Sequence, residues 1–153
     1  MSKQKPNYEQ LLRKAIKDAK EAAPRAVEDL LRVASEAADA VEKVTEGTAV
    51  LEMVPLDSEE GATKAYQLQL RKTGSEAPPT DLGVYSTTTA GYPVMRWYSR
   101  RGWEDHPDEP NQQYPGSNEL EGNFRWMLSN HESRLVVLLT FFQEQLKKAS
   151  GAK

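Results

Sequence analysis

Residues 64–72, KAYQLQLRK, decide the fold class because apolar and polar side chains alternate along them. Tyr66, Leu68 and Leu70 fall on one face of an extended chain, and two glutamines fall on the other. This alternation predicts a β-strand with one face against a core and the other toward water. The stretch therefore places part of an antiparallel sheet near the middle of the chain.

Similar segments lie on both sides of this strand. TAVLEMVPL precedes it, with Leu51 and Met53 on one side, and the turn-rich DSEEG connects the two as a hairpin. LGVYSTT and YPVMRWYS follow it as β-prone runs joined at a turn around Gly91. We expect residues 48–99 to form a small antiparallel sheet of three to four strands.

The N-terminal third of the chain has helical periodicity. Asn7 and Gln10 have the spacing of a capping pair, and apolar residues then recur every three or four positions. Pro24 interrupts the series, and Gly47 is a natural C-terminal cap. We therefore expect residues 7–47 to form either a hairpin of two helices or one helix kinked at Pro24.

The last third contains a polar segment followed by helical patterns. Residues 100–116 are rich in proline and charge, which predicts a long loop. Residues 117–149 predict helices, although the continuous apolar run RLVVLLTFF leaves a strand as an alternative. With residues 1–6 expected to be disordered, the pattern predicts a single α+β domain, residues 1–153, whose C-terminal helices pack on the sheet.

The composition limits the environment and the chemistry of the protein. The chain has 153 residues, a net charge of -3 and no cysteine, so disulfides and thiolate chemistry are excluded. The acidic balance argues against a general polyanion binder. No run approaches the roughly 20 apolar residues of a membrane span. We expect a cytoplasmic protein that does not associate with membranes.

The usual motifs of catalysis and metal binding are absent from the sequence. Its two histidines, His106 and His131, lie in an acidic proline-rich segment and in a helix-capping segment, without partners at a recognisable spacing. There is no Gly-x-Ser-x-Gly elbow and no phosphate-binding glycine loop. We therefore expect no enzyme activity, no metal and no cofactor.

The most concentrated chemistry lies in GYPVMRWYSRRGW, residues 91–103, where aromatic side chains alternate with three arginines. In a strand, Tyr92, Val94, Arg96 and Tyr98 point to one face, and the residues between them point to the other. Six acidic residues follow within the next eighteen positions, and we expect them to form ion pairs with the neighbouring arginines.

Two binding functions fit this segment. Trp, Tyr and Arg are enriched where protein partners bind tightly, and aromatic residues with arginines also suit stacking on single-stranded nucleic acid. By analogy with small acidic domains, we expect a non-catalytic protein-binding domain of the adaptor, inhibitor or immunity type, with nucleic-acid binding as the alternative. The N-terminal helices offer a possible homo-oligomer interface. The expected partner-binding residues are Trp97, Tyr98, Arg100, Arg101 and Trp103.

Overall fold

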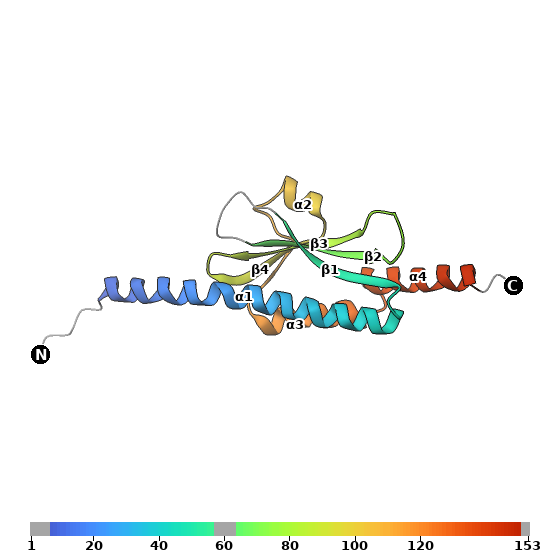
Figure 1. Cartoon of the computed structure of the whole chain (residues 1–153). Coiled ribbons are helices and arrows are strands. Elements are labelled where there is room, and N and C mark those ends of the chain that lie inside the picture. The colour runs from blue at the N-terminus through green and yellow to red at the C-terminus, as the bar shows by residue number, and fades with distance from the viewer. Residues whose placement is uncertain (1–6, 57–63, 151–153) are drawn as a thin grey trace, which may run out of the picture.

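The computed structural model describes residues 7–56 and 64–150 and shows an α+β fold (Figure 1). A long N-terminal helix precedes an antiparallel sheet, and helices follow it, which confirms the expected α+β class; the sheet has five strands rather than the expected three to four, because β5 adds to its edge. Residues 1–6, which we expected to be disordered, and the DSEEG turn lie outside the described residues. The elements are α1 (Tyr8–Thr45), β1 (Ala49–Leu56), β2 (Ala65–Lys72), β3 (Thr80–Thr88), β4 (Gly91–Trp97), α2 (Arg100–Asp105), β5 (Gln112–Tyr114), α3 (Ser117–Ser129) and α4 (Arg134–Ser150).

The sheet is a meander in which each strand pairs antiparallel with the next, in the order β1-β2-β3-β4-β5. Leu51 lies opposite Leu70, and Met53 lies opposite Leu68. Because side chains alternate along a strand, these four residues share the face that packs against the helices. The alternation in KAYQLQLRK therefore identified the core face correctly.

Helix α1 is one continuous helix that contains Pro24, so of the two expected alternatives the single helix is confirmed and the helical hairpin is wrong. Asn7 caps its start by accepting a 3.1 Å hydrogen bond from the Gln10 backbone N–H. The helix passes through Pro24, which removes one backbone donor. The helix has a buried face that runs from Ala26 to Thr45. It ends at Glu46, a left-handed cap.

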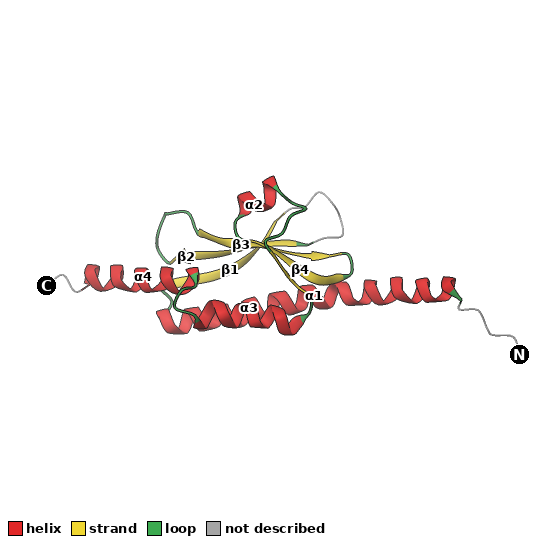
Figure 2. Cartoon of the chain, turned by 180° about the vertical axis from the view of Figure 1, so that it is seen from behind, coloured by secondary structure: helices red, strands yellow, loops and turns green. Residues whose placement is uncertain are grey.

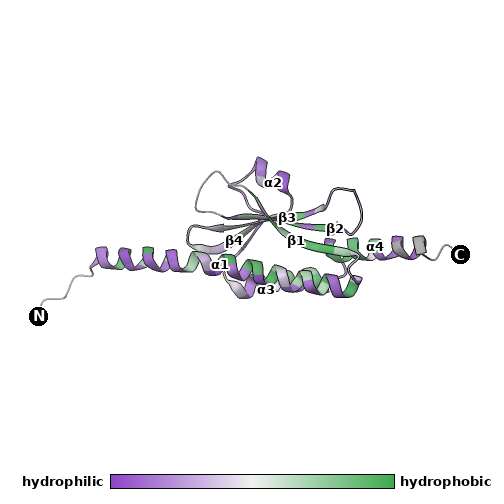
Figure 3. Cartoon of the chain, in the orientation of Figure 1, coloured by the Kyte–Doolittle hydropathy of each residue, from purple (hydrophilic) through white to green (hydrophobic). Residues whose placement is uncertain are grey.

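The helices cover both faces of the sheet unequally. α1 and α3 lie under one face, and the short α2 lies over the other, as two opposite views show (Figures 1 and 2). The main core between sheet and helices contains Leu30, Leu68, Tyr85 and Phe124. In Figure 3 the green, hydrophobic colouring lies on β1, on the half of α1 beneath the sheet, and on parts of α3 and α4.

The segment 100–116 is not the expected long loop, because it contains α2 and β5. Ser99 caps α2 by accepting a 3.0 Å hydrogen bond from the Gly102 backbone N–H. Tyr114 is buried opposite Val94, which attaches β5 to the edge of the sheet. These contacts hold the polar segment 100–116 against the sheet. RLVVLLTFF belongs to α4, so the strand alternative for it is wrong.

A bulge in β3 sets the orientation of its side chains. The pairing of β2 with β3 shifts between Gln67 and Gln69, and Leu82 and Tyr85 both pack in the main core. Gly83 has a φ of +120°, and a Cβ there would lie 2.6 Å from the Trp97 carbonyl oxygen. Only glycine fits this close approach. The bulge thus places both core side chains on the helix side.

Candidate functional site

The five expected partner-binding residues do not form one exposed patch. Trp97 is only 2% exposed, and its indole N–H donates a 2.9 Å hydrogen bond to the His106 carbonyl. It packs with Val84 on the α2 side of the sheet, where Trp103 covers it. Tyr98 is exposed on the opposite side and lines a cavity beneath the sheet. The sheet therefore separates Tyr98 from the two tryptophans.

The two arginines of α2 form ion pairs within their own helix. Arg100 Nε lies 2.8 Å from Glu104 Oε1, and Arg101 Nε lies 3.4 Å from Asp105 Oδ2. Both pairs have the i, i+4 spacing of neighbours on a helix surface. This arrangement confirms the expected pairing with the acidic residues that follow. It also reduces the positive charge that this surface offers to a phosphate backbone.

Arg96 behaves differently from these two arginines. Its guanidinium carbon lies 5.2 Å from the ring centre of Tyr85 and 5.4 Å from that of Tyr98. Within residues 7–56 and 64–150, no carboxylate lies within ion-pair distance of it. Nη2 donates a long 3.4 Å hydrogen bond to the Leu82 carbonyl, and Nε is buried without a partner. Arg96 is thus a half-buried cation without an acidic neighbour.

The Arg96 guanidinium lines a cavity of about 500 Å³ between the sheet, α3 and the start of α4. Its volume is within the range of small-molecule sites, about 300–1,000 Å³. The residues that line it are Leu82, Arg96, Tyr98, Gln112, Tyr114, Asn123, Trp126, Met127, Ser133, Arg134 and Leu135.

Two tyrosine hydroxyls near the Arg96 guanidinium, those of Tyr85 and Tyr114, are already engaged. Tyr85 donates a 2.8 Å hydrogen bond to Asn123 Oδ1, and Tyr114 donates a 2.6 Å hydrogen bond to Gln112 Oε1. Burial raises the pKa of Tyr85 well above its ordinary value, so the phenol stays neutral. Because both amides accept through oxygen, their NH₂ groups remain as donors.

The Ser133 side chain at this cavity is engaged by the backbone. The Ser133 hydroxyl donates a 2.6 Å hydrogen bond to the Met127 carbonyl and accepts one from the Val136 backbone N–H at 3.2 Å. It therefore caps the start of α4. Neither histidine lines the cavity.

A second feature is the N-terminal half of α1, which projects past the sheet (Figure 1). The helix face that is buried at Ala26 and Leu30 continues toward the N-terminus at Tyr8, Leu12 and Ile16, by the helical repeat. These three side chains are 74%, 62% and 47% exposed. The apolar face of α1 thus extends toward the N-terminus beyond the part of the helix that the sheet covers.

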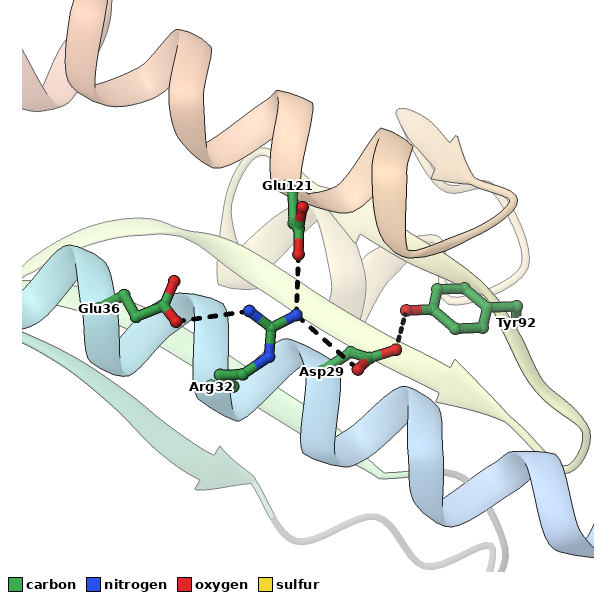
Figure 4. A network of polar contacts seen from close by, with 5 residues as sticks. All are labelled: Asp29, Arg32, Glu36, Tyr92 and Glu121. Atoms are coloured by element: carbon green, nitrogen blue, oxygen red, sulfur yellow. Dashed lines mark hydrogen bonds and ion pairs between the residues drawn. The ribbon is translucent and has the colours of Figure 1, made fainter.

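A polar network holds the packed half of α1 in place (Figure 4). Arg32 Nη2 lies 2.8 Å from Glu121 Oε1 on α3, and Arg32 Nη1 lies 3.4 Å from Glu36. The Tyr92 hydroxyl, from β4, donates a 2.8 Å hydrogen bond to Asp29. These contacts connect α1 to α3 and to the sheet where the projecting half begins.

The backbone at Gly91 packs closely against α1 at the point where its projecting half begins. A Cβ on Gly91 would lie 2.8 Å from the Ala22 carbonyl oxygen and 3.0 Å from the Ala26 Cβ. Its φ of +92° is also one that residues with a Cβ rarely adopt. Glycine on the hairpin and alanines on the helix therefore allow the β3-β4 turn to touch α1.

Comparison of the chain with protein-family models, with curated proteins and with solved structures found no match. Among the residues that the structure describes, no helix combines the length and hydrophobicity needed to cross a bilayer. The evidence for function therefore comes from the geometry of this chain.

Sequence reasoning placed Arg96 on the same strand face as Val94 and Tyr98, but it did not recognise the cavity. The signal was present, because Val94 is a core residue and an arginine two positions later faces the same side. A charged side chain on the core face of a strand must find a partner or a cavity. The cavity itself depends on α3 and α4, whose positions the strand pattern cannot give.

Proposed function

We propose that this protein is a non-catalytic protein-binding domain and that the projecting half of α1 binds the partner. The observation that carries this proposal is the exposure of Tyr8, Leu12 and Ile16 on the face that forms the core farther along the same helix. A helical apolar face with side chains at i, i+4 and i+8 is the usual anchor of an amphipathic helix in a partner's groove.

The energetics favour a covered state for this face. Isolated helices of this length are marginal in water and gain most of their stability from packing of the apolar face. Burying an exposed Leu or Ile side chain contributes about 1.5–3 kcal/mol. Leu12 and Ile16 therefore offer a large part of the energy that a specific complex needs.

The charges on the projecting half indicate the chemistry of the partner. Residues 8–25 contain five basic and three acidic side chains, whereas the whole chain has a net charge of -3. An acidic partner with an apolar groove complements this segment. A second copy of the chain would instead bring two positive segments together. We therefore propose a different protein as the partner.

The contacts of the 91–103 segment support protein binding over the nucleic-acid alternative. Trp97 is buried, and both arginines of α2 have carboxylate neighbours, so a basic aromatic platform is not exposed there. Tyr98, Arg100, Arg101 and Trp103 remain candidates for additional partner contacts outside α1.

The test uses a double variant on the apolar face, Leu12→Ser with Ile16→Ser. Its control is Gln10→Ser with Glu21→Ser, on the opposite face of the same helix segment. A partner is captured from the native host, identified by mass spectrometry, purified and titrated against each protein by calorimetry. We expect the control to bind like wild type and the double variant to bind at least about tenfold more weakly.

Circular dichroism melts accompany the titrations and should coincide for all three proteins, because these side chains lie outside the core. Equal affinity of the double variant and the control would contradict the proposal. So would a wild-type dimer in light scattering that the double variant loses, since the face would then bind a second copy. Binding of the wild type to anionic vesicles, lost in the double variant, would assign the face to a lipid surface instead.

A further inference from the structure

The guanidinium of Arg96 is an unusual group to leave half-buried without a counter-charge. Removing a cation from water is costly unless an anion or several hydrogen bonds compensate for it. The Tyr85 and Tyr98 rings, the long hydrogen bond to the Leu82 carbonyl and the neighbouring Tyr114 hydroxyl compensate for it with neutral groups and supply no counter-charge. The guanidinium therefore retains donors that an anion in the adjacent cavity can use.

The other polar groups at the cavity also favour an anionic ligand. Arg134 lines the wall, and among the described residues it makes no ion pair. The amide NH₂ groups of Gln112 and Asn123 are available because their oxygens accept from tyrosine. Within residues 7–56 and 64–150, no aspartate or glutamate lines the cavity. The polar lining thus includes several donors, among them two positively charged guanidinium groups.

The remaining walls are apolar. Leu82, Met127 and Leu135 are buried core residues that contribute to the lining, and the half-exposed Trp126 stands at the opening. An inorganic anion would leave these surfaces wet. A ligand that fills the cavity needs a hydrophobic body attached to its anionic group.

We propose that this cavity is a binding site for an organic carboxylate with an aromatic or branched aliphatic body. The carboxylate pairs with Arg96, with Arg134 and the two amides as further donors, and the body packs against Met127, Leu135 and Trp126. A free small molecule and the C-terminal carboxylate of a peptide share this chemistry. The site is separate from the projecting half of α1, so it does not depend on the proposed partner.

The experiment titrates the full chain with four probes and follows backbone and arginine Nε–H resonances by NMR. The probes are 3-phenylpropionate, its uncharged amide, inorganic phosphate and N-acetyl-phenylalanine, which represents a peptide C-terminus. We expect 3-phenylpropionate to shift the resonances of Arg96 and Asn123 saturably and to raise the melting temperature. The amide should bind at least about tenfold more weakly, because it lacks the charge.

Variants separate ligand binding from a structural role of the arginine. Arg96→Gln and Arg134→Gln should each weaken 3-phenylpropionate binding, whereas Arg101→Gln removes an exposed charge of α2 and should leave it unchanged. Trp126→Leu tests the apolar wall from an exposed position and covers the case in which Arg96→Gln fails to fold. We expect this variant to weaken binding of 3-phenylpropionate by about tenfold, through lost packing.

Each alternative result has a defined meaning. Preferential binding of N-acetyl-phenylalanine over 3-phenylpropionate assigns the site to a peptide terminus, and the reverse assigns it to a free molecule. Either result supports a carboxylate site. Equal binding of the amide, binding of phosphate alone, or binding that Arg96→Gln, Arg134→Gln and Trp126→Leu all leave intact would overturn the proposal. Absence of saturable shifts with every probe would also overturn it.

Discussion

The two halves of α1 are built alike but have different surroundings. Leu30 and Leu12 lie on the same face of one unbroken helix, yet Leu30 is fully buried and Leu12 is 62% exposed. The difference comes from the sheet, which covers the helix from about Ala26 onward and not before. An amphipathic pattern therefore identifies a helix and its apolar face, but it does not reveal what covers that face.

The largest expected effect is the difference in the free energy of unfolding between leucine-to-alanine variants in the two halves of α1. Leu30→Ala leaves a cavity in the main core and should lower the free energy of unfolding by about 2–5 kcal/mol. Leu12→Ala removes a side chain exposed to water and should change it by less than about 0.5 kcal/mol. Urea denaturation at neutral pH measures both. Similar losses for the two variants would show that the projecting half is packed in solution.

A smaller loss in the free energy of unfolding should follow from a substitution at Gly91, which contacts α1 where its two halves meet. Gly91→Ala adds a Cβ against Ala22 and Ala26 and also strains a positive φ, so it should cost about 2–4 kcal/mol. Gly74→Ala is the control, because its φ is +76° but no atom lies within 4 Å of the added Cβ. Denaturation of both variants isolates the helix contact. Equal losses would mean that backbone strain alone explains the cost.

The smallest effect should come from the hydrogen bond between Tyr92 and Asp29. Tyr92→Phe leaves the Asp29 carboxylate with one donor fewer and should cost about 0.5–1.5 kcal/mol at neutral pH. Tyr8→Phe, on the exposed projecting half, is the matched control and should cost nothing measurable. Chemical denaturation of the two variants compares them directly.

The same bond predicts how stability depends on pH. Burial, and then the hydrogen bond to Asp29, raise the pKa of Tyr92 above its ordinary value of 10.0. The neutral phenol is therefore favoured in the folded state, and its contribution is complete below pH 10 and is lost as the pH rises above that value. Wild type should lose stability above pH 10 more steeply than Tyr92→Phe. Parallel losses in the two proteins would contradict the assigned role of Tyr92.

The strands were predictable because their information is local. Alternation places Leu68 and Leu70 on one face whatever the helices do, and the register with Leu51 and Met53 follows from that face. The ion pairs of Arg100 and Arg101 were predictable for the same reason, since their partners lie four residues away.

The features that sequence reasoning missed depend on distant contacts. Pro24 looked like a boundary, but α1 continues through it from Tyr8 to Thr45. Trp97 looked like a surface aromatic, but a helix turn carrying Trp103 covers it. The cavity beside Arg96 needs β4, α3 and α4 together. None of these arrangements has a signature within a single window of sequence.

The unbroken course of α1 also has a mechanical meaning. At 1.5 Å per residue, its outer end lies about 27 Å beyond Ala26, and no loop intervenes that could act as a hinge. The C-terminal end of α4 leaves the molecule in the opposite direction (Figure 2). A protein held at Tyr8 would therefore be carried at about this spacing from the sheet, and Pro24, which lacks a backbone donor, is the point at which the helix between them can bend.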